Sequence, residues 1–270
     1  MPFIQVNGLM IHYEIKGKGK PLVILHGMGN NSQSWKNQLD GLSEHFTIIA
    51  WDAPGYGKSS DPDEELRNFS QFADVLKGFI ENLNYESVTI LGHSMGSAIA
   101  LDFCHRNPQM VDALIISDAT RGSAGLSKEE NEKKLEIRLK NIDTLKPTEI
   151  AKKRVKELLA PEPKKEVEKE AERIMSQVRP MGYRSVAYSL FHLNQMDTLS
   201  SISVPTLIIC GELDKVTPVS ESQIFHELIP NSTFVIIPRS GHLCYQEDPA
   251  SFNSVVYNFI SNLNEDLIKQ

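Results

Sequence analysis

The chain has 270 residues, a length that one large hydrophobic core can serve, and 40% of its residues are apolar while 23% are charged. This composition is typical of a folded globular protein and excludes a disordered or membrane-embedded chain. The formal net charge of −7 argues against a nucleic-acid partner, which would require clustered lysine and arginine side chains.

The first predicted element is an antiparallel β-hairpin over residues 3–15, which alternate around Asn7-Gly8, a dipeptide that readily takes the positive φ angles of a tight turn. The N-terminal residues lack the charged start and continuous apolar stretch of a secretory signal, and no run reaches transmembrane length. Three cysteines, Cys104, Cys210 and Cys244, show no paired metal-type spacing and suit a reducing compartment. We therefore expect a cytoplasmic protein that does not associate with membranes.

Six short apolar runs after the hairpin predict buried strands, over residues 22–25, 47–51, 87–91, 113–117, 205–210 and 233–238. Between these strands lie segments whose apolar residues have helical spacing, for example residues 69–83 and 252–263. Thr217-Pro218 and Asp248-Pro249 are predicted to supply the cap and the first-turn proline of the last two helices. The alternation predicts an α/β fold, with a mostly parallel sheet covered by helices on both faces.

One segment, residues 121–198, breaks this alternation, because it has a charged helical pattern and no convincing strand. Ser127 and Glu130 match a capping box at its start. We predict a core domain over residues 1–120 and 199–270, with residues 121–198 inserted as a helical cap that does not fold separately. The lysines between Lys128 and Lys169 are interleaved with glutamates, and we interpret them as a solvated face with helical ion pairs.

The sharpest local motif is Gly92-His93-Ser94-Met95-Gly96, which follows a predicted strand directly and precedes a helical segment. A serine on such a tight strand-to-helix turn has a strained backbone that exposes its hydroxyl, and the flanking glycines remove side chains that would clash. The following helix also directs its positive N-terminal dipole toward the serine. The motif predicts Ser94 as a nucleophile, although the same pentapeptide also occurs as a plain turn.

A second glycine-rich turn, His26-Gly27-Met28-Gly29, follows the strand over residues 22–25. Acyl transfer requires two hydrogen-bond donors at the developing oxyanion, and the backbone N–H groups of Met28 and Met95 are the candidates. Gly27 and His93, beside these two residues, are predicted to contact the substrate. The alternative is a structural glycine turn in which His26 makes a supporting hydrogen bond.

The predicted base is His242, which lies in a loop just beyond the last predicted strand. His192, within the inserted segment, ranks second, whereas His12 and His26 early in the chain are expected to be surface or capping residues. A carboxylate must orient the base, and both Asp118 and Asp214 follow predicted strands.

These motifs, together with Asp52-Ala53-Pro54-Gly55-Tyr56-Gly57-Lys58-Ser59, resemble in their order the α/β-hydrolase fold family, and the resemblance covers nearly the whole chain. It implies an eight-stranded sheet with a cap over the pocket, and a triad of Ser94, Asp214 and His242, with Asp214 preferred over Asp118 by chain order. It also implies an oxyanion hole from Met28 and Met95. A serine at this turn disfavours the branches of the family that use aspartate or cysteine as the nucleophile.

The resulting hypothesis is a serine hydrolase that cleaves a small to medium carboxylic ester through an acyl-enzyme on Ser94, with no metal or organic cofactor. A hydrolase of carbon–carbon bonds in ring-cleavage products would use the same residues. A non-catalytic signalling or binding protein of the same fold is the alternative outside enzymes. The expected partner is a small ester-like molecule, and a monomer and a homodimer both remain open.

Overall fold

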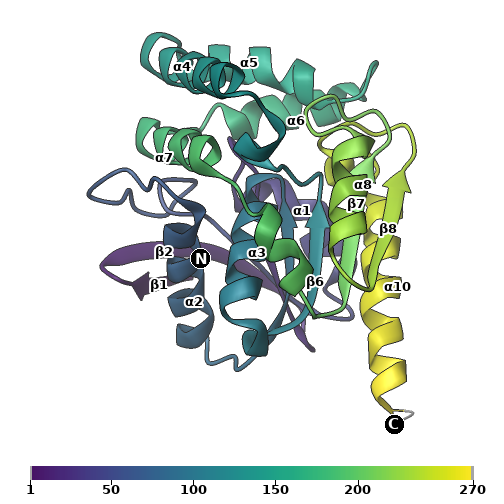
Figure 1. Ribbon diagram of the computed structural model, residues 1–270. Coiled ribbons are helices and arrows are strands. Elements are labelled where there is room, and N and C mark those ends of the chain that lie inside the picture. The colour runs from purple at the N-terminus through teal and green to yellow at the C-terminus, as the bar shows by residue number, and fades with distance from the viewer. Residues whose placement is uncertain (1, 269–270) are drawn as a thin grey trace.

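The computed structural model describes residues 2–268, over which eight strands form one sheet in the order β1-β2-β4-β3-β5-β6-β7-β8 (Figure 1). The strands are β1 (Phe3–Val6), β2 (Leu9–Lys16), β3 (Pro21–Leu25), β4 (Thr47–Trp51), β5 (Val88–His93), β6 (Val111–Ser117), β7 (Thr206–Gly211) and β8 (Ser232–Ile237). β2 pairs antiparallel with β1 and β4, and every other neighbouring pair is parallel. This arrangement confirms the predicted α/β fold.

The N-terminal hairpin forms as the turn dipeptide predicts. Asn7 and Gly8 take φ angles of 49° and 84°, and Val6 pairs with Leu9 across the turn. A glycine has no Cβ and adopts such angles without strain, which is why this dipeptide closes tight hairpins.

Buried side chains alternate between the two faces of the parallel strands, because successive residues of a strand point to opposite sides. On β3, Val23 and Leu25 belong to one hydrophobic cluster, while Leu22 and Ile24 belong to the other. Helices α2 (Phe69–Asn82), α3 (Met95–Arg106) and α8 (Val219–Leu228) supply the first cluster; α1 (Lys36–Leu42) and α10 (Pro249–Ile268) supply the second. The sheet is therefore covered on both faces.

The segment between β6 and β7 forms four α-helices: α4 (Lys128–Thr144), α5 (Pro147–Leu158), α6 (Lys165–Met175) and α7 (Pro180–His192). They gather at one end of the sheet (Figure 1). Ser127 and Glu130 make the predicted reciprocal capping bonds at the start of α4. Pro147 and Pro180 each occupy the first position of a helix, where a missing N–H costs nothing.

Of the two helix caps predicted near the C-terminus, the one before α10 is confirmed and the one before α8 is not. Before α10, the Asp248 carboxylate accepts a hydrogen bond of 3.1 Å from Ser251 N, as expected of a cap. Before α8, the prediction is wrong, because Pro218 is itself the capping residue and the Thr217 hydroxyl lies against Asp214 instead. None of the helices in the described part of the chain is long and apolar enough to cross a membrane.

Candidate active site

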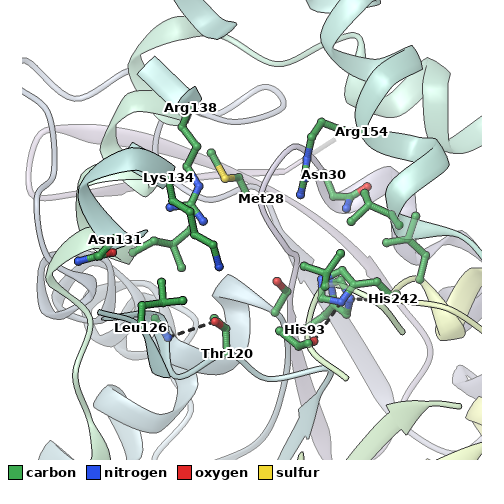
Figure 2. Close-up of a pocket in the computed structure, with 17 residues that line it drawn as sticks. Met28, Asn30, His93, Thr120, Leu126, Asn131, Lys134, Arg138, Arg154 and His242 are labelled. Atoms are coloured by element: carbon green, nitrogen blue, oxygen red, sulfur yellow. Dashed lines mark hydrogen bonds between the residues drawn. The ribbon is translucent and has the colours of Figure 1, made fainter. Parts of the chain in front are cut away.

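Loops from several strands meet at one edge of the sheet, because the carboxyl ends of parallel strands point the same way. The turn after β3 carries Met28, the turn after β5 carries Ser94, and the loops after β7 and β8 carry Asp214 and His242. Met28, Ser94 and His242 line one cavity of about 110 Å³ (Figure 2). Three separate parts of the sequence therefore converge there.

The backbone of Ser94 is strained, with φ of 53° and ψ of −113°. A β carbon on Gly92 would lie 2.3 Å from Gly96 O, and one on Gly96 would lie 2.3 Å from Leu25 O. Both neighbours are backbone atoms that cannot move aside, so the turn requires glycine at both positions. A non-glycine residue in this region costs on the order of 1–3 kcal/mol, and such strain concentrates at functional sites.

Asp214 and His242 form a buried hydrogen-bonded pair. His242 Nδ1 lies 2.7 Å from Asp214 Oδ2, and the two residues are 3% and 5% exposed, respectively. The other carboxylate oxygen accepts hydrogen bonds from the backbone N–H groups of Val216 and Thr217, at 2.7 and 3.1 Å. The Thr217 hydroxyl also lies 2.7 Å from Asp214 Oδ2. These contacts fix the carboxylate and, through it, the imidazole ring.

The pKa values of this pair are shifted in opposite directions. Burial opposes ionisation of Asp214, but attraction to His242 and hydrogen bonds from His242 and Thr217 outweigh it and lower the pKa of Asp214 to about 2. Burial by itself would lower the pKa of His242, but the charge and hydrogen bond of Asp214 outweigh it and raise that pKa above its usual value. The carboxylate therefore stabilises a protonated imidazole.

Asp118, the alternative carboxylate, is buried beside the pair and does not hydrogen-bond to His242 in the described structure. Its carboxylate accepts bonds from Gly211 N at 2.9 Å and Ser117 Oγ at 2.6 Å. Burial, with repulsion from Asp214, raises the pKa of Asp118 to about 7 despite attraction to His242. The geometry favours Asp214 as the residue that orients His242.

Ser94 and His242 line the same cavity, but among the described residues no hydrogen bond joins the Ser94 hydroxyl to the imidazole. His242 Nδ1 is engaged by Asp214, so Nε2 is the ring nitrogen left for a partner on the other side. Contacts between a nucleophile and its base are often long in unliganded sites and tighten when substrate binds.

The two amides predicted to bind an oxyanion are placed on separate turns at this edge. Met95 is the first residue of α3, where backbone N–H groups have no partner within the helix. Met28 lines the cavity from the turn after β3. His26 fixes that turn, because Ala53 N donates to its Nε2 at 3.0 Å and its Nδ1 lies 2.9 Å from Gly27 O. His26 is fully buried, so the expectation of a surface or capping residue was wrong for it, whereas these two contacts agree with the alternative of a structural hydrogen-bonding residue.

The two residues predicted to contact substrate have mainly packing contacts here. His93 lines the cavity, but its Nε2 lies 2.7 Å from the backbone oxygen of His242. Burial and repulsion from His242 lower the pKa of His93 to about 3, so its ring is neutral and donates that bond. Gly27 packs against it, since a β carbon there would lie 2.6 Å from His93 Nδ1. Both residues position the site, and substrate contact by either stays a prediction.

Two other histidines are removed from the cavity. His192, the second candidate base, is exposed and its Nδ1 lies 3.0 Å from Arg67 O. His12 was expected at the surface, but it is 1% exposed and lies 2.8 Å from Asp52 Oδ2. Asp52 also accepts hydrogen bonds from the backbone of Ser32 and Lys58, so it joins the segment after β3 to the loop after β4.

The loop that carries His242 is attached to the inserted helical segment. His242 N donates to Leu158 O at 2.7 Å, at the end of α5. The Glu247 carboxylate accepts hydrogen bonds from Ala160 N at 2.8 Å and from Gly241 N at 2.7 Å. The position of the imidazole therefore depends on this segment as well as on the sheet.

Basic residues of the inserted segment line the cavity, a feature that the sequence analysis missed. Lys134 and Arg138 come from α4 and Arg154 comes from α5, and Figure 2 shows them on opposite sides of the cavity above His93 and His242. The interpretation of these runs as a solvated face with ion pairs was therefore incomplete. The sequence did contain a signal for this feature, because Lys134 and Arg138 are four residues apart and so lie on one face of a helix.

A buried group of Asp118, Cys210 and Asp214 has ligand-type atoms within 4.8 Å of one another. Asp214 is already bonded to His242 and Thr217, and burial raises the pKa of the Cys210 thiol, which would have to ionise to bind a metal. The group therefore does not have the donors of a metal site. Cys104 and Cys244 are also free thiols, and both are buried.

A family model described as "alpha/beta hydrolase fold" matches residues 20–249. Among the curated relatives, a 2-hydroxy-6-oxo-6-(2'-aminophenyl)hexa-2,4-dienoic acid hydrolase from Metapseudomonas resinovorans is 30% identical over 96% of this chain and 90% of that protein.

Two solved structures are similar over nearly the whole chain. An esterase from Exiguobacterium antarcticum is 27% identical, with a TM-score of 0.86, over 96% of this chain and 98% of that one. A thermophilic esterase from Thermogutta terrifontis has a TM-score of 0.89 at 24% identity, covering 97% of both chains, and supports the fold alone.

Proposed function

The chain belongs to the alpha/beta hydrolase fold family and is a hydrolase by fold and relatives, and on that premise we propose that it is a serine hydrolase cleaving a small to medium carboxylic ester. The observation that supports this most directly is the strained backbone of Ser94, a residue that lines the same cavity as His242. The likeness to an esterase at 27% identity supports an ester as the substrate.

In the proposed mechanism, neutral His242 takes the proton of the Ser94 hydroxyl as the oxygen attacks the ester carbonyl. Asp214 holds the ring in the tautomer with the proton on Nδ1 and stabilises the imidazolium that forms. The backbone N–H groups of Met28 and Met95 receive the oxyanion. His242 then protonates the leaving alcohol, and water, deprotonated by the same ring, releases the acid from Ser94.

A second candidate is the hydrolysis of a carbon–carbon bond in a ring-cleavage product. The relative that supports it, a hydrolase of a 2-hydroxy-6-oxo-dienoic acid, is 30% identical over 96% of the chain. The same three side chains would serve both reactions, so the fold does not separate them.

The first test is labelling of Ser94 with a fluorophosphonate probe, together with turnover of short 4-nitrophenyl esters. Ser94→Ala removes the nucleophile and is expected to lower kcat by on the order of 10³-fold or more, with a circular dichroism spectrum unchanged from the parent. Ser200→Ala, at an exposed serine, is the matched control. If the folded protein neither reacts with the probe nor hydrolyses any substrate tested, a binding protein of this fold is the better description.

The second test separates the two reactions with a vinylogous 1,5-diketone that bears a carboxylate. Ester turnover with no cleavage of the diketone supports the proposed esterase. Cleavage of the diketone without ester turnover would reverse the order of the two candidates.

A further inference from the structure

The cavity at Ser94 is bordered by positive charge and by no carboxylate among the described residues that line it. Lys134, Arg138 and Arg154 line it from two different helices, while its remaining lining residues are apolar or uncharged apart from the histidines. The whole molecule carries a formal net charge of −7, so this local excess of positive charge runs against the overall composition.

Among the described residues, Arg138 has no ion-pair or hydrogen-bond partner that would explain its position. Seven other arginines form ion pairs with Asp or Glu: Arg67, Arg106, Arg121, Arg154, Arg173, Arg179 and Arg184. Within the described residues no carboxylate lies within ion-pair distance of Arg138. The Arg138 side chain is nevertheless half-buried, and burial together with repulsion from Arg154 lowers its pKa. A half-buried cation without a counter-charge is costly to maintain unless a ligand supplies the charge.

The positive charge continues outward from the inner cavity. A second cavity of about 560 Å³ shares Lys134, Arg138 and Arg154 with the first and adds Lys156 and Lys215. Glu157 is the one carboxylate among its lining residues in the described structure. A cleft lined by charge of one sign raises the local concentration of oppositely charged substrate.

The inner cavity also contains an unsatisfied polar group. The side-chain oxygen of Asn30, a residue only 2% exposed, has no hydrogen-bond partner among the described residues. Asn30 and Ser94 line the same cavity, and Figure 2 shows Asn30 below Arg154. Buried polar groups normally have partners, so this amide indicates that the occupant of the cavity has polar atoms in addition to its charge.

We propose that the substrate hydrolysed at Ser94 is an organic acid, whose free carboxylate is held by Arg138, with Lys134 and Arg154 completing the positive rim. The inference rests on the proposed function and adds the substrate class to it. The planar guanidinium groups of Arg138 and Arg154 match the two oxygens of a carboxylate, which favours this anion over a neutral polar group. Arg138 is the principal contact because it has no competing carboxylate, whereas Arg154 is paired with Glu157.

The test compares esters that differ only in this charge. Mono-4-nitrophenyl adipate is matched with 4-nitrophenyl hexanoate for a carboxylate on the acyl side. For a carboxylate on the leaving group, 4-acetoxybenzoate is matched with its methyl ester. We expect kcat/KM for the charged member of at least one pair to exceed that of its neutral partner by about tenfold or more, since hydrogen bonds to charged groups are stronger than neutral ones.

Variants on α4 assign the preference to Arg138. Arg138→Gln is expected to lower the charged-to-neutral ratio of kcat/KM by about tenfold, and Arg138→Lys should recover part of it because the charge is kept. The control is Lys140→Gln, an exposed residue of the same helix outside both cavities. Added salt should lower the ratio for the parent protein more than for Arg138→Gln. Equal kcat/KM within both pairs, or a ratio that Arg138→Gln leaves unchanged, overturns the inference.

A separate measurement keeps this inference distinct from the proposed function. Calorimetric titration of monomethyl adipate and of methyl hexanoate into the Ser94→Ala protein tests the anion site without any reaction. Binding of the charged ester alone, lost in Ser94→Ala/Arg138→Gln, supports the carboxylate site even if no ester is turned over. Hydrolysis of neutral esters with no preference for either ligand leaves the proposed function in place and rejects the site.

Discussion

Asp118 and Asp214 are two buried carboxyl groups near His242. They lie close together, but their pKa values are shifted in opposite directions. The pKa of Asp214 falls to about 2, because attraction and hydrogen bonds from His242 and Thr217 outweigh its burial, and the pKa of Asp118 rises to about 7, chiefly because of burial. Below about pH 7 Asp118 is therefore mostly protonated, and Asp214, bonded to the imidazole, carries the negative charge of the two. Thr217 contributes to this difference by placing its hydroxyl and its N–H against Asp214.

The raised pKa of His242 predicts the pH dependence of activity. The base must be neutral to accept the proton of Ser94, so kcat/KM should fall as the pH drops through a pKa above the ordinary value of about 6.5. Asp214→Asn removes the charge that raises this pKa, so burial dominates and the fall in rate should move to lower pH. The amide also favours the wrong tautomer, and kcat should decrease by on the order of 10³- to 10⁴-fold.

The measurement is a profile of kcat/KM against pH for the parent protein, Asp214→Asn and Asp112→Asn. Asp112 is exposed near the start of β6, and its variant should reproduce the parent profile. An unchanged midpoint in Asp214→Asn would mean that another group controls the titration. A flat parent profile between about pH 5 and 8 would argue against His242 as the base.

At the scale of elements, the inserted helices are held to the core by close backbone contacts. The start of α7 lies against the loop after β4, where a β carbon on Gly182 would be 2.3 Å from Gly55 O. Arg179, just before α7, donates to Gly57 O and to Ser59 O in the same loop. At the other end of the cavity, Glu247 joins the segment after α5 to the loop of His242. The helices that line the cavity are thus positioned from two sides.

Gly182→Ala tests the contact between α7 and the loop after β4. Alanine is the better helix former, by about 1 kcal/mol, but its β carbon would overlap a backbone oxygen that the loop cannot easily move. Overpacking of this kind costs about 1–3 kcal/mol. We expect the overlap with Gly55 O to outweigh the gain in helix propensity. The midpoint of thermal unfolding should therefore fall by several degrees, at ~2–4 °C per kcal/mol for a chain of this size.

Thermal unfolding followed by circular dichroism measures this change, and Lys140→Ala, at an exposed position of α4, is the control. A midpoint at or above that of the parent would show that helix propensity prevails and that α7 can shift away from the loop. In that case KM should rise, because α7 supplies the Leu190 side chain to the cavity.

On the scale of the whole molecule, both hydrophobic clusters cross from the sheet into the inserted helices. One contains Ile142, Tyr183 and Val186 together with residues of β3 and α2. The other contains Val155 and Met175 together with residues of β3 and α10. Residues 121–198 therefore share the apolar core of the sheet and have no cluster of their own among the described residues.

This sharing predicts one cooperative unfolding transition. Scanning calorimetry of the intact chain should give a single peak with calorimetric and van't Hoff enthalpies in agreement. A peptide of residues 121–198 should show little helix in water, because most helical stability in proteins comes from packing of an apolar face. Two resolved peaks, or a stably helical peptide, would identify the segment as an independent folding unit.

The strands, the covering helices and the strained turn at Ser94 could be predicted from the amino-acid sequence, because these features depend on local periodicity and on glycines at fixed positions. The sequence also narrowed the orienting carboxylate to Asp118 and Asp214, both of which follow strands. Which of the two hydrogen-bonds to His242 follows only from the folded structure, since that contact depends on how loops after different strands meet.

Three other features likewise follow only from the folded structure. They are the burial of His12 against Asp52, the hydrogen bond from Thr217 to Asp214, and the position of Arg138 at the cavity. Charge and periodicity along one helix indicate that a residue lies off the apolar face. They do not indicate whether that face meets water or a cavity, because that depends on what packs opposite it.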